Sequence, residues 1–245
     1  MQTVIKDILA NYEVLGSNNQ RAILILHGWG HSLENWKVVA EKLAKEYKVI
    51  LLDLPGFGSS SVPIVTFGTQ EYSEFINEFV KKIGLNNFIL IGHSLGGKIA
   101  IKNSVKNLKI ERLFLISPSG IDNKSYLTKI KIIFIKIAKI FLFWTPESIK
   151  RKYIKIFASS DYISAGSMLK IFKKVVDEKV VLDAENIRVP TVIVWGENDK
   201  EINIKNSKKL KGFIKNSTLR ILWGVGHSPS IEAPDRLANL LLEYL

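Results

Sequence analysis

Short apolar runs alternate with amphipathic segments along most of this chain. Residues 22–26 form a continuous apolar run, which is typical of a strand buried on both faces of a sheet. Apolar side chains then recur at helical spacing over residues 36–47, and residues 49–52 are the next apolar run. Strand and helix patterns in alternation predict a mostly parallel sheet with helices on both faces.

The alternation continues to the end of the chain, with one long interruption. An amphipathic helix is predicted at 69–83, with Thr69 as its N-cap and Gly84 as its stop. Near the N-terminus, only residues 12–15 have a clear strand pattern. The remaining predicted elements are strands at 88–91, 113–116, 191–195 and 219–222, and helices at 96–106, 206–211 and 235–245.

The interruption, residues 121–187, differs in kind from the rest. Its pattern is helical, it has few strand signals, and it is rich in Lys, Ile and Phe. We therefore predict an α/β fold in which residues 1–120 and 188–245 form a doubly wound, mostly parallel core and residues 121–187 form an inserted helical cap. In such a sheet, functional sites form at the carboxyl ends of the strands.

Composition narrows the class of protein. A chain of 245 residues suits one large α/β domain with an insertion. It contains no cysteine, which excludes disulfides, thiolate metal sites and a cysteine nucleophile. The N-terminal segment lacks the features of a signal peptide, and no uncharged apolar run is long enough to span a bilayer. We expect a cytoplasmic protein.

The net charge of +12 is concentrated in the predicted cap. Residues 124–155 contain nine basic residues and one acid, Glu147, so that this segment alone contributes +8. The first interpretation is a solvated lysine-rich surface, and the alternative is contact with an anionic membrane or an acidic carrier protein. Nucleic acid is not an expected partner, because the chain has neither zinc-finger spacing nor a Walker motif.

Glycine and ionisable residues follow most of the predicted strands. In chain order, the segments are HGWGHS, DLPGFGSS, GHSLGGK, GENDKE and WGVGHSP. GHSLG matches G-x-S-x-G between a predicted strand and a predicted helix, which is the context of a nucleophile elbow. Close approach of that strand and helix explains Gly92 and Gly96, and the strained turn between them exposes the hydroxyl of Ser94. Ser94 is therefore the candidate nucleophile.

A serine hydroxyl needs a base, and the base needs an orienting acid. His227 follows the last predicted strand and Asp199 follows the strand before it. The chain order Ser94, Asp199, His227 is the order that accompanies this kind of elbow. Rival acids are Glu197, Glu201, Asp177 and Asp183.

The other histidines offer a competing interpretation. His27, His31 and Asp53 are metal-ligating residue types, but their spacing does not require a metal site. We expect His27 to order the loop that follows it and Asp53 to hold its turn together, and we expect His31 and His93 to be structural or exposed. No metal or cofactor is predicted.

Taken together, the five segments resemble those of α/β-hydrolases, in family order and at family-like spacing over nearly the whole chain. The resemblance implies that Ser94 is the nucleophile, Asp199 the acid and His227 the base. It also implies that the backbone N–H groups of Trp29 and Leu95 form the oxyanion hole. Among the aromatic residues, Trp29 and Trp144 are the expected pocket residues.

These features predict a serine carboxylic-ester hydrolase that acts on esters or lactones of small to medium apolar acids. Serine at the elbow disfavours epoxide and carbon–halogen chemistry, for which related enzymes have an aspartate there. Three alternatives remain: an esterase resembling those that act on pimeloyl-acyl-carrier-protein methyl ester, to whose segments HGWG and LPGFG are similar; a carbon–carbon bond hydrolase of aromatic degradation; and a ligand receptor with little turnover.

Overall fold

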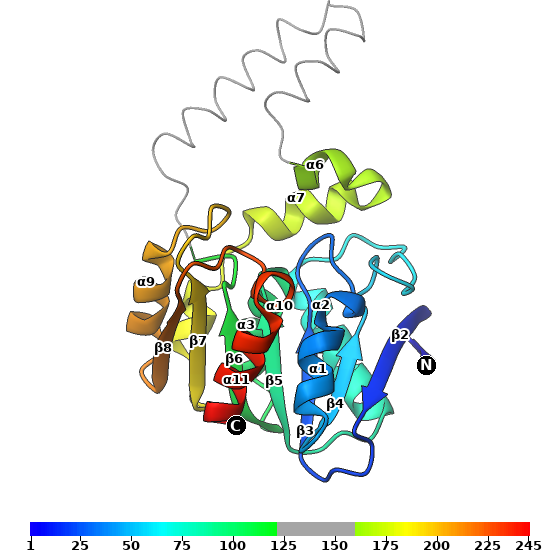
Figure 1. Cartoon of the computed structure of the whole chain (residues 1–245). Helices are drawn as coiled ribbons and strands as arrows, with labels where there is room; N and C mark the ends of the chain where they lie inside the picture. The colour runs from blue at the N-terminus through cyan, green and yellow to red at the C-terminus, as the bar shows by residue number, and fades with distance from the viewer. Residues whose placement is uncertain (122–159) are drawn as a thin grey trace, which may run out of the picture.

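A computed structural model describes residues 1–121 and 160–245 (Figure 1). Within these residues, one sheet contains eight strands in the order β1-β2-β4-β3-β5-β6-β7-β8. The pairs β1–β2 and β2–β4 are antiparallel, and every other neighbouring pair is parallel. The strands are β1 (Gln2–Ile5), β2 (Ile8–Leu15), β3 (Ala22–Leu26), β4 (Lys48–Leu52), β5 (Phe88–His93), β6 (Ile110–Ile116), β7 (Thr191–Gly196) and β8 (Ser217–Leu222).

Helices cover both faces of the sheet, as the sequence pattern predicts (Figure 1). They are α1 (Lys37–Leu43), α2 (Thr69–Lys82), α3 (Leu95–Ser104), α6 (Ser160–Ser164), α7 (Leu169–Asp177), α8 (Val181–Glu185), α9 (Lys205–Phe213), α10 (Pro229–Glu232) and α11 (Pro234–Tyr244), with 3-10 turns at Leu33–Trp36 and Gly166–Met168. Helices α1 and α11 pack in one hydrophobic cluster, and α2, α3, α7, α8 and α9 pack in a second cluster on the opposite face.

Burial on both faces explains why the central strands are continuous apolar runs. In β3, Leu24 and Leu26 belong to the cluster under α2 and α3, whereas Ile23 and Ile25 belong to the cluster under α1 and α11. Successive side chains of a strand point to opposite faces, so a strand that is covered on both sides has no polar position.

The N-terminal hairpin is more extensive than the sequence pattern indicates. Residues 12–15 are the end of β2, which begins four residues earlier and pairs with β1. The two strands are joined by Lys6 and Asp7, whose φ angles of 47° and 64° are both positive. Two residues with positive φ make the tight turn that matches the twist of a hairpin. Neither residue is a glycine or an asparagine, so the turn has no strong sequence signal.

The predicted N-cap of α2 is wrong by one position. Gly68 is the N-cap and Thr69 is the first helical residue. A carboxylate of Glu178 accepts hydrogen bonds from both the backbone N–H and the hydroxyl of Thr69. An acid distant in sequence therefore satisfies the helix end that a local side chain was expected to cap.

The described part of the predicted cap, residues 160–187, is largely helical, and α6 and α7 lie over the carboxyl edge of the sheet (Figure 1). Lys98 of α3, a lysine that is only 1% exposed, connects this segment to the core by hydrogen bonds. The Lys98 ammonium donates to the backbone carbonyls of Val175 and Glu178, at the end of α7. Burial lowers the pKa of Lys98 to about 8, against the favourable charge of Glu178. The helix that follows Ser94 therefore also positions α7.

Residues 122–159 lie outside the described part of the chain. They include Trp144, one of the two expected pocket residues, and the whole of the basic segment 124–155. The division into a core and a cap over 121–187 therefore stays a prediction.

The close packing at the start of α3 generates a test of stability. A Cβ on Gly96 would lie 2.3 Å from the carbonyl oxygen of Leu26 and 2.6 Å from that of His27, so Gly96→Ala forces backbone to move. We expect it to lower the free energy of unfolding by at least about 1–3 kcal/mol, the usual cost of overpacking. Gly212→Ala in α9 is the matched control, because nothing lies within 4 Å of its added methyl group. The control should gain about 0.5–1 kcal/mol from helix propensity. Urea denaturation measures both, and equal stability of the two variants would contradict the packing account.

Candidate active site

The turn between β5 and α3 holds Ser94 in a strained conformation. Ser94 has φ 49° and ψ −109°, a region that residues with a side chain rarely adopt. Its backbone N–H donates to the carbonyl of Ile116 at the end of β6 (3.0 Å), and the N–H of Gly96 donates to the carbonyl of His27 after β3 (3.1 Å). Neighbouring strands on both sides therefore hold the turn in place, and such strain costs about 1–3 kcal/mol.

The glycines beside Ser94 are required by close contact, as the sequence interpretation expects. A Cβ on Gly92 would lie 2.5 Å from the carbonyl oxygen of Gly96. A Cβ on Gly97 would lie 2.8 Å from the side chain of Pro118. No side chain fits at either position, so the strand can turn directly into the helix with the serine at its apex.

His227 and Asp199 meet at the carboxyl ends of β7 and β8. The Nδ1 atom of His227 lies 2.8 Å from Oδ2 of Asp199, whose side chain is fully buried. The other carboxylate oxygen of Asp199 accepts the backbone N–H groups of Glu201 and Ile202, each at 2.9 Å. The carboxylate is thus fixed from both sides, with one oxygen left for the imidazole.

Of the rival acids, Glu197 and Asp183 have other partners. Glu197 accepts the backbone N–H of Gly224 at 2.9 Å, and Asp183 pairs with Lys102 at 3.0 Å. Glu201 approaches the imidazole from its other side, because Oε2 lies 3.4 Å from Nε2 of His227. Asp199 is therefore the carboxylate that is hydrogen-bonded to Nδ1 of His227.

Electrostatics favour the charged forms of both groups. Burial opposes ionisation of Asp199, but hydrogen bonds from His227 and Ile202 outweigh it, and the pKa of Asp199 lies below its ordinary value. Burial also disfavours the imidazolium of His227. The hydrogen bond to Asp199 and the charges of Asp199 and Glu201 outweigh that effect, so the pKa of His227 lies above its ordinary value of 6.5.

The loop after β3 passes close to Ser94. A Cβ on Gly28 would lie 3.3 Å from Cβ of Ser94, so this backbone borders the serine. His27 orders the loop: its Nδ1 donates to the carbonyl of Gly28 (2.7 Å), and its Nε2 accepts the N–H of Leu54 (3.0 Å). Burial lowers the pKa of His27 to about 4, against a hydrogen bond to the Gly28 carbonyl, so the ring is neutral. The loop that carries Trp29 is therefore held next to the turn that carries Leu95.

These segments surround one cavity of about 240 Å³. It is lined by Gly28, Trp29, Gly30, His31, His93, Ser94, Asp161, Ser164, Glu201 and His227. The cavity thus brings together three of the predicted site residues, Ser94, His227 and Trp29. The other two lie beside them: Asp199 is hydrogen-bonded to His227, and Leu95 follows Ser94 as the first residue of α3.

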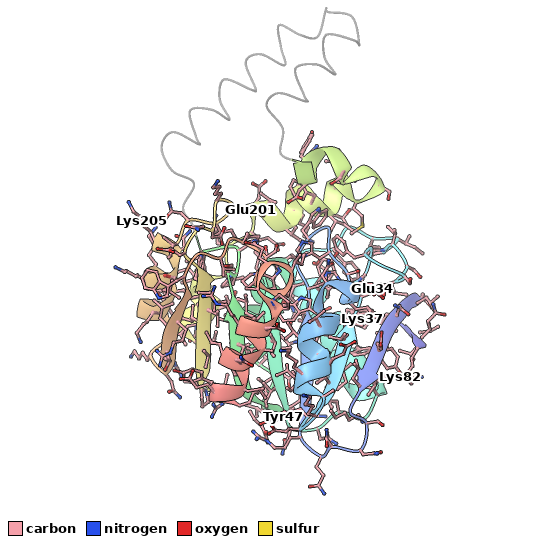
Figure 2. The ribbon with its side chains drawn as sticks, in the orientation of Figure 1. Glu34, Lys37, Tyr47, Lys82, Glu201 and Lys205 are labelled. Atoms are coloured by element: carbon pink, nitrogen blue, oxygen red, sulfur yellow. The ribbon has the colours of Figure 1, made fainter. Side chains whose placement is uncertain are left out.

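The sequence analysis considered Glu201 only as a rival acid and did not name Asp161, although both side chains line the cavity. Asp161 comes from α6, and Glu201 lies two residues beyond Asp199, at the carboxyl edge of the sheet (Figure 2). The position of Glu201 beside Asp199 was the available signal, since the loop that aims one side chain at the imidazole brings its neighbours close. Asp161 had no such signal.

His93 is hydrogen-bonded to the backbone of the candidate base. Its Nε2 donates to the backbone carbonyl of His227 at 2.8 Å, and the ring stacks against His31 with centroids 5.6 Å apart. Burial, together with the nearby rings of His227 and His31, lowers the pKa of His93 to about 3. His93 is therefore a neutral structural residue, in agreement with the sequence interpretation.

The alternative metal site receives no support from the geometry. Asp53 accepts the backbone N–H groups of Leu33 (2.7 Å) and Ser59 (2.9 Å), which is the turn-holding role expected of it. Over residues 1–121 and 160–245, no group of three or more metal-ligating side chains is arranged to hold an ion. In the same residues, no helix is long and apolar enough to cross a membrane.

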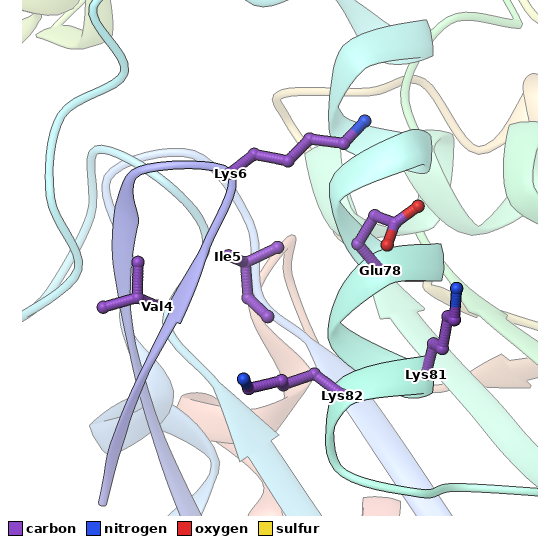
Figure 3. Close-up of a pocket in the computed structure, with 6 residues that line it drawn as sticks. All are labelled: Val4, Ile5, Lys6, Glu78, Lys81 and Lys82. Carbon is purple, nitrogen blue, oxygen red and sulfur yellow. The ribbon is translucent and has the colours of Figure 1, made fainter.

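A second cavity, of about 390 Å³, lies between the N-terminal hairpin and α2. It is lined by Val4, Ile5, Lys6, Glu78, Lys81 and Lys82 (Figure 3). Its larger volume does not make it the better candidate, because its described lining contains no nucleophile beside a base. The cavity at Ser94 is the candidate active site.

Comparison with known proteins agrees with this fold. The family profile described as the α/β hydrolase fold matches residues 21–136. Lipase 3 of Moraxella sp. (strain TA144) is 28% identical, with 89% of this chain and 75% of that protein covered. Monoacylglycerol lipase ABHD6 of Homo sapiens is 26% identical, with 91% of this chain and 75% of that protein covered.

A solved structure of a putative lipase from Acinetobacter baumannii AYE is 27% identical and superposes with a TM-score of 0.76, covering all of this chain and 89% of that one. The strand order, the strained turn after β5 and these similarities agree with one another. The chain has the α/β-hydrolase fold and is similar to lipases of that fold.

Proposed function

We propose that this protein is a serine carboxylic-ester hydrolase that acts on esters or lactones of small to medium apolar acids. One observation carries the proposal: Ser94, on a strained turn, and His227, held by the buried carboxylate of Asp199, line the same cavity. A nucleophile, a base and an orienting acid in this arrangement are the requirements for acyl transfer. The names of the relatives, lipase and monoacylglycerol lipase, support an ester as the bond that is cleaved.

In the first half of the reaction, Oγ of Ser94 attacks the ester carbonyl carbon and Nε2 of His227 takes the hydroxyl proton. Asp199 keeps Nδ1 protonated and stabilises the imidazolium that forms. The carbonyl oxygen becomes an oxyanion, for which the backbone N–H groups of Trp29 and Leu95 are the proposed donors. Loss of one such donor costs about 10²–10³ in kcat in a well-studied serine hydrolase.

The tetrahedral intermediate then collapses. The bond to the leaving oxygen breaks, that oxygen takes the proton from Nε2 of His227, and the alcohol departs. Water attacks the acyl-Ser94 ester and gives its proton to Nε2, and the second collapse returns that proton to Oγ of Ser94 and releases the acid. One ester and one water become one acid and one alcohol, and no cofactor takes part.

Aromatic rings beside the cavity support an apolar acyl group. The ring of Trp29 meets those of Phe57 and Phe172 edge to face, both at 4.9 Å between centroids. Phe172 belongs to α7, inside the predicted cap. We propose that the cap over residues 121–187 covers this apolar side and sets the acyl chain length, with Trp144 as a further pocket residue.

The test of the proposed function is hydrolysis of p-nitrophenyl esters from acetate to palmitate. The wild-type chain should release nitrophenol with an initial burst, because an acyl-enzyme accumulates when deacylation is slower than acylation. Ser94→Ala should lose at least about a thousandfold in kcat/KM while its unfolding transition remains cooperative. Wild-type rates in that variant would exclude Ser94 as the nucleophile.

The charges around His227 generate a prediction for the pH dependence. His227 acts as a base only when neutral, so kcat/KM should rise with pH through its pKa, which lies above 6.5. Buried Asp199 is the main cause of the raised value, and Glu201 adds to it. Glu201→Gln removes one negative charge, so the acid limb of the profile should move to lower pH on a neutral ester. An acid limb at the same pH in wild type and variant would contradict the proximity of Glu201 to Nε2.

A further inference from the structure

Two carboxylates, those of Glu201 and Asp161, line the cavity that also contains the imidazole of His227. Oε2 of Glu201 lies 3.4 Å from Nε2 of His227. Asp161 of α6 lines the same cavity. Burial raises the pKa of Asp161, against the opposing effects of His31 and His227. The chain as a whole is strongly basic, with a net charge of +12, so this acidic pair is a local reversal of sign.

Within the described part of the cavity lining, no positive side chain offsets the pair. Among the described residues that line it, none is a lysine or an arginine. Burial lowers the pKa of His31, and His93 is neutral with a pKa of about 3, so neither ring supplies a charge at neutral pH. His93 is 1% exposed, and its Nδ1 has no hydrogen-bond partner among the described residues. Among the described lining residues, Glu201 and Asp161 are therefore the acidic side chains, and no lysine or arginine accompanies them.

The direction of proton transfer in the proposed reaction places the alcohol portion of the ester close to Glu201. In the proposed reaction, Nε2 of His227 protonates the leaving oxygen, so the alcohol must lie in contact with Nε2. A group carried one or two carbons from that oxygen then lies beside Glu201. The acyl chain is on the other side of the carbonyl carbon and does not share this environment.

We propose that Glu201 and Asp161 determine specificity on the alcohol side, selecting esters whose alcohol carries a positive charge and rejecting those whose alcohol is anionic. The inference rests on the proposed ester hydrolysis and adds the charge class of the alcohol. The side chain of Glu201 is 65% exposed, so water and salt screen part of its charge. We expect a preference of about threefold to tenfold in kcat/KM for the cation at low ionic strength.

The test uses three butyrate esters with alcohols of similar size and different charge: choline, its uncharged isostere 3,3-dimethylbutanol, and isethionate, a sulfonate. The wild-type order of kcat/KM should be cation, neutral, anion. Glu201→Gln combined with Asp161→Asn should bring the cation-to-neutral ratio to about one, and sodium chloride at 0.5 M should reduce the wild-type ratio in the same direction.

Glu197→Gln is the matched control, because Glu197 lies on the same loop but does not line the cavity. It removes the same charge from the chain and should leave the cation-to-neutral ratio at the wild-type value. A wild-type ratio of one or less, or an equal change of ratio in Glu197→Gln and Glu201→Gln, would overturn the inference. If no ester is hydrolysed in a Ser94-dependent way, the proposed function itself fails, and that outcome is distinct from hydrolysis without charge preference.

Discussion

The site depends on the contact between the start of α3 and the end of β3. Gly96 lies against the carbonyl oxygens of Leu26 and His27 so closely that a single methyl group would not fit. That contact forces β5 to turn abruptly, which holds Ser94 at positive φ with its side chain at the cavity. The same contact brings the loop that carries Trp29 beside the turn, so the nucleophile and the proposed oxyanion donors are consequences of one packing constraint.

The second half of the site comes from the opposite side of the sheet's carboxyl edge. β7 and β8 are neighbours, and the loops that follow them deliver Asp199 and His227 to each other. Full burial of the Asp199 side chain is tolerated because two backbone N–H groups and the imidazole satisfy it. His93 donates a hydrogen bond to the backbone carbonyl of His227 and so helps to hold the pair in position.

The cavity has both aromatic and acidic neighbours. Trp29 lines it and contacts the rings of Phe57 and Phe172. The carboxylates of Asp161 and Glu201 also line it, with Glu201 3.4 Å from Nε2 of His227. An ester has two ends, with an acyl chain on one side of the reacting carbon and an alcohol on the other. The two proposals therefore describe two ends of a single substrate.

The sequence predicted the central strands and the site residues better than the edges of the fold. Strands buried on both faces are continuous apolar runs, and the glycines around Ser94 are demanded by backbone contact, so both leave local signals. The hairpin turn at Lys6 and Asp7 left only a weak signal, because aspartate tolerates positive φ but lysine does not favour it, and neither position is a glycine. Asp161 left no signal, since only tertiary packing brings α6 to the cavity.

The central claim is that His227 and Asp199 activate Ser94 as a covalent nucleophile. The most direct measurement is the mass of peptides from protein treated with an uncharged alkyl fluorophosphonate, which reacts with activated serines and stays attached. We expect one adduct per chain on the peptide that contains Ser94, formed in proportion to the loss of esterase activity. Full inactivation with the adduct on another residue, or an active enzyme that forms no adduct at Ser94, would contradict the account.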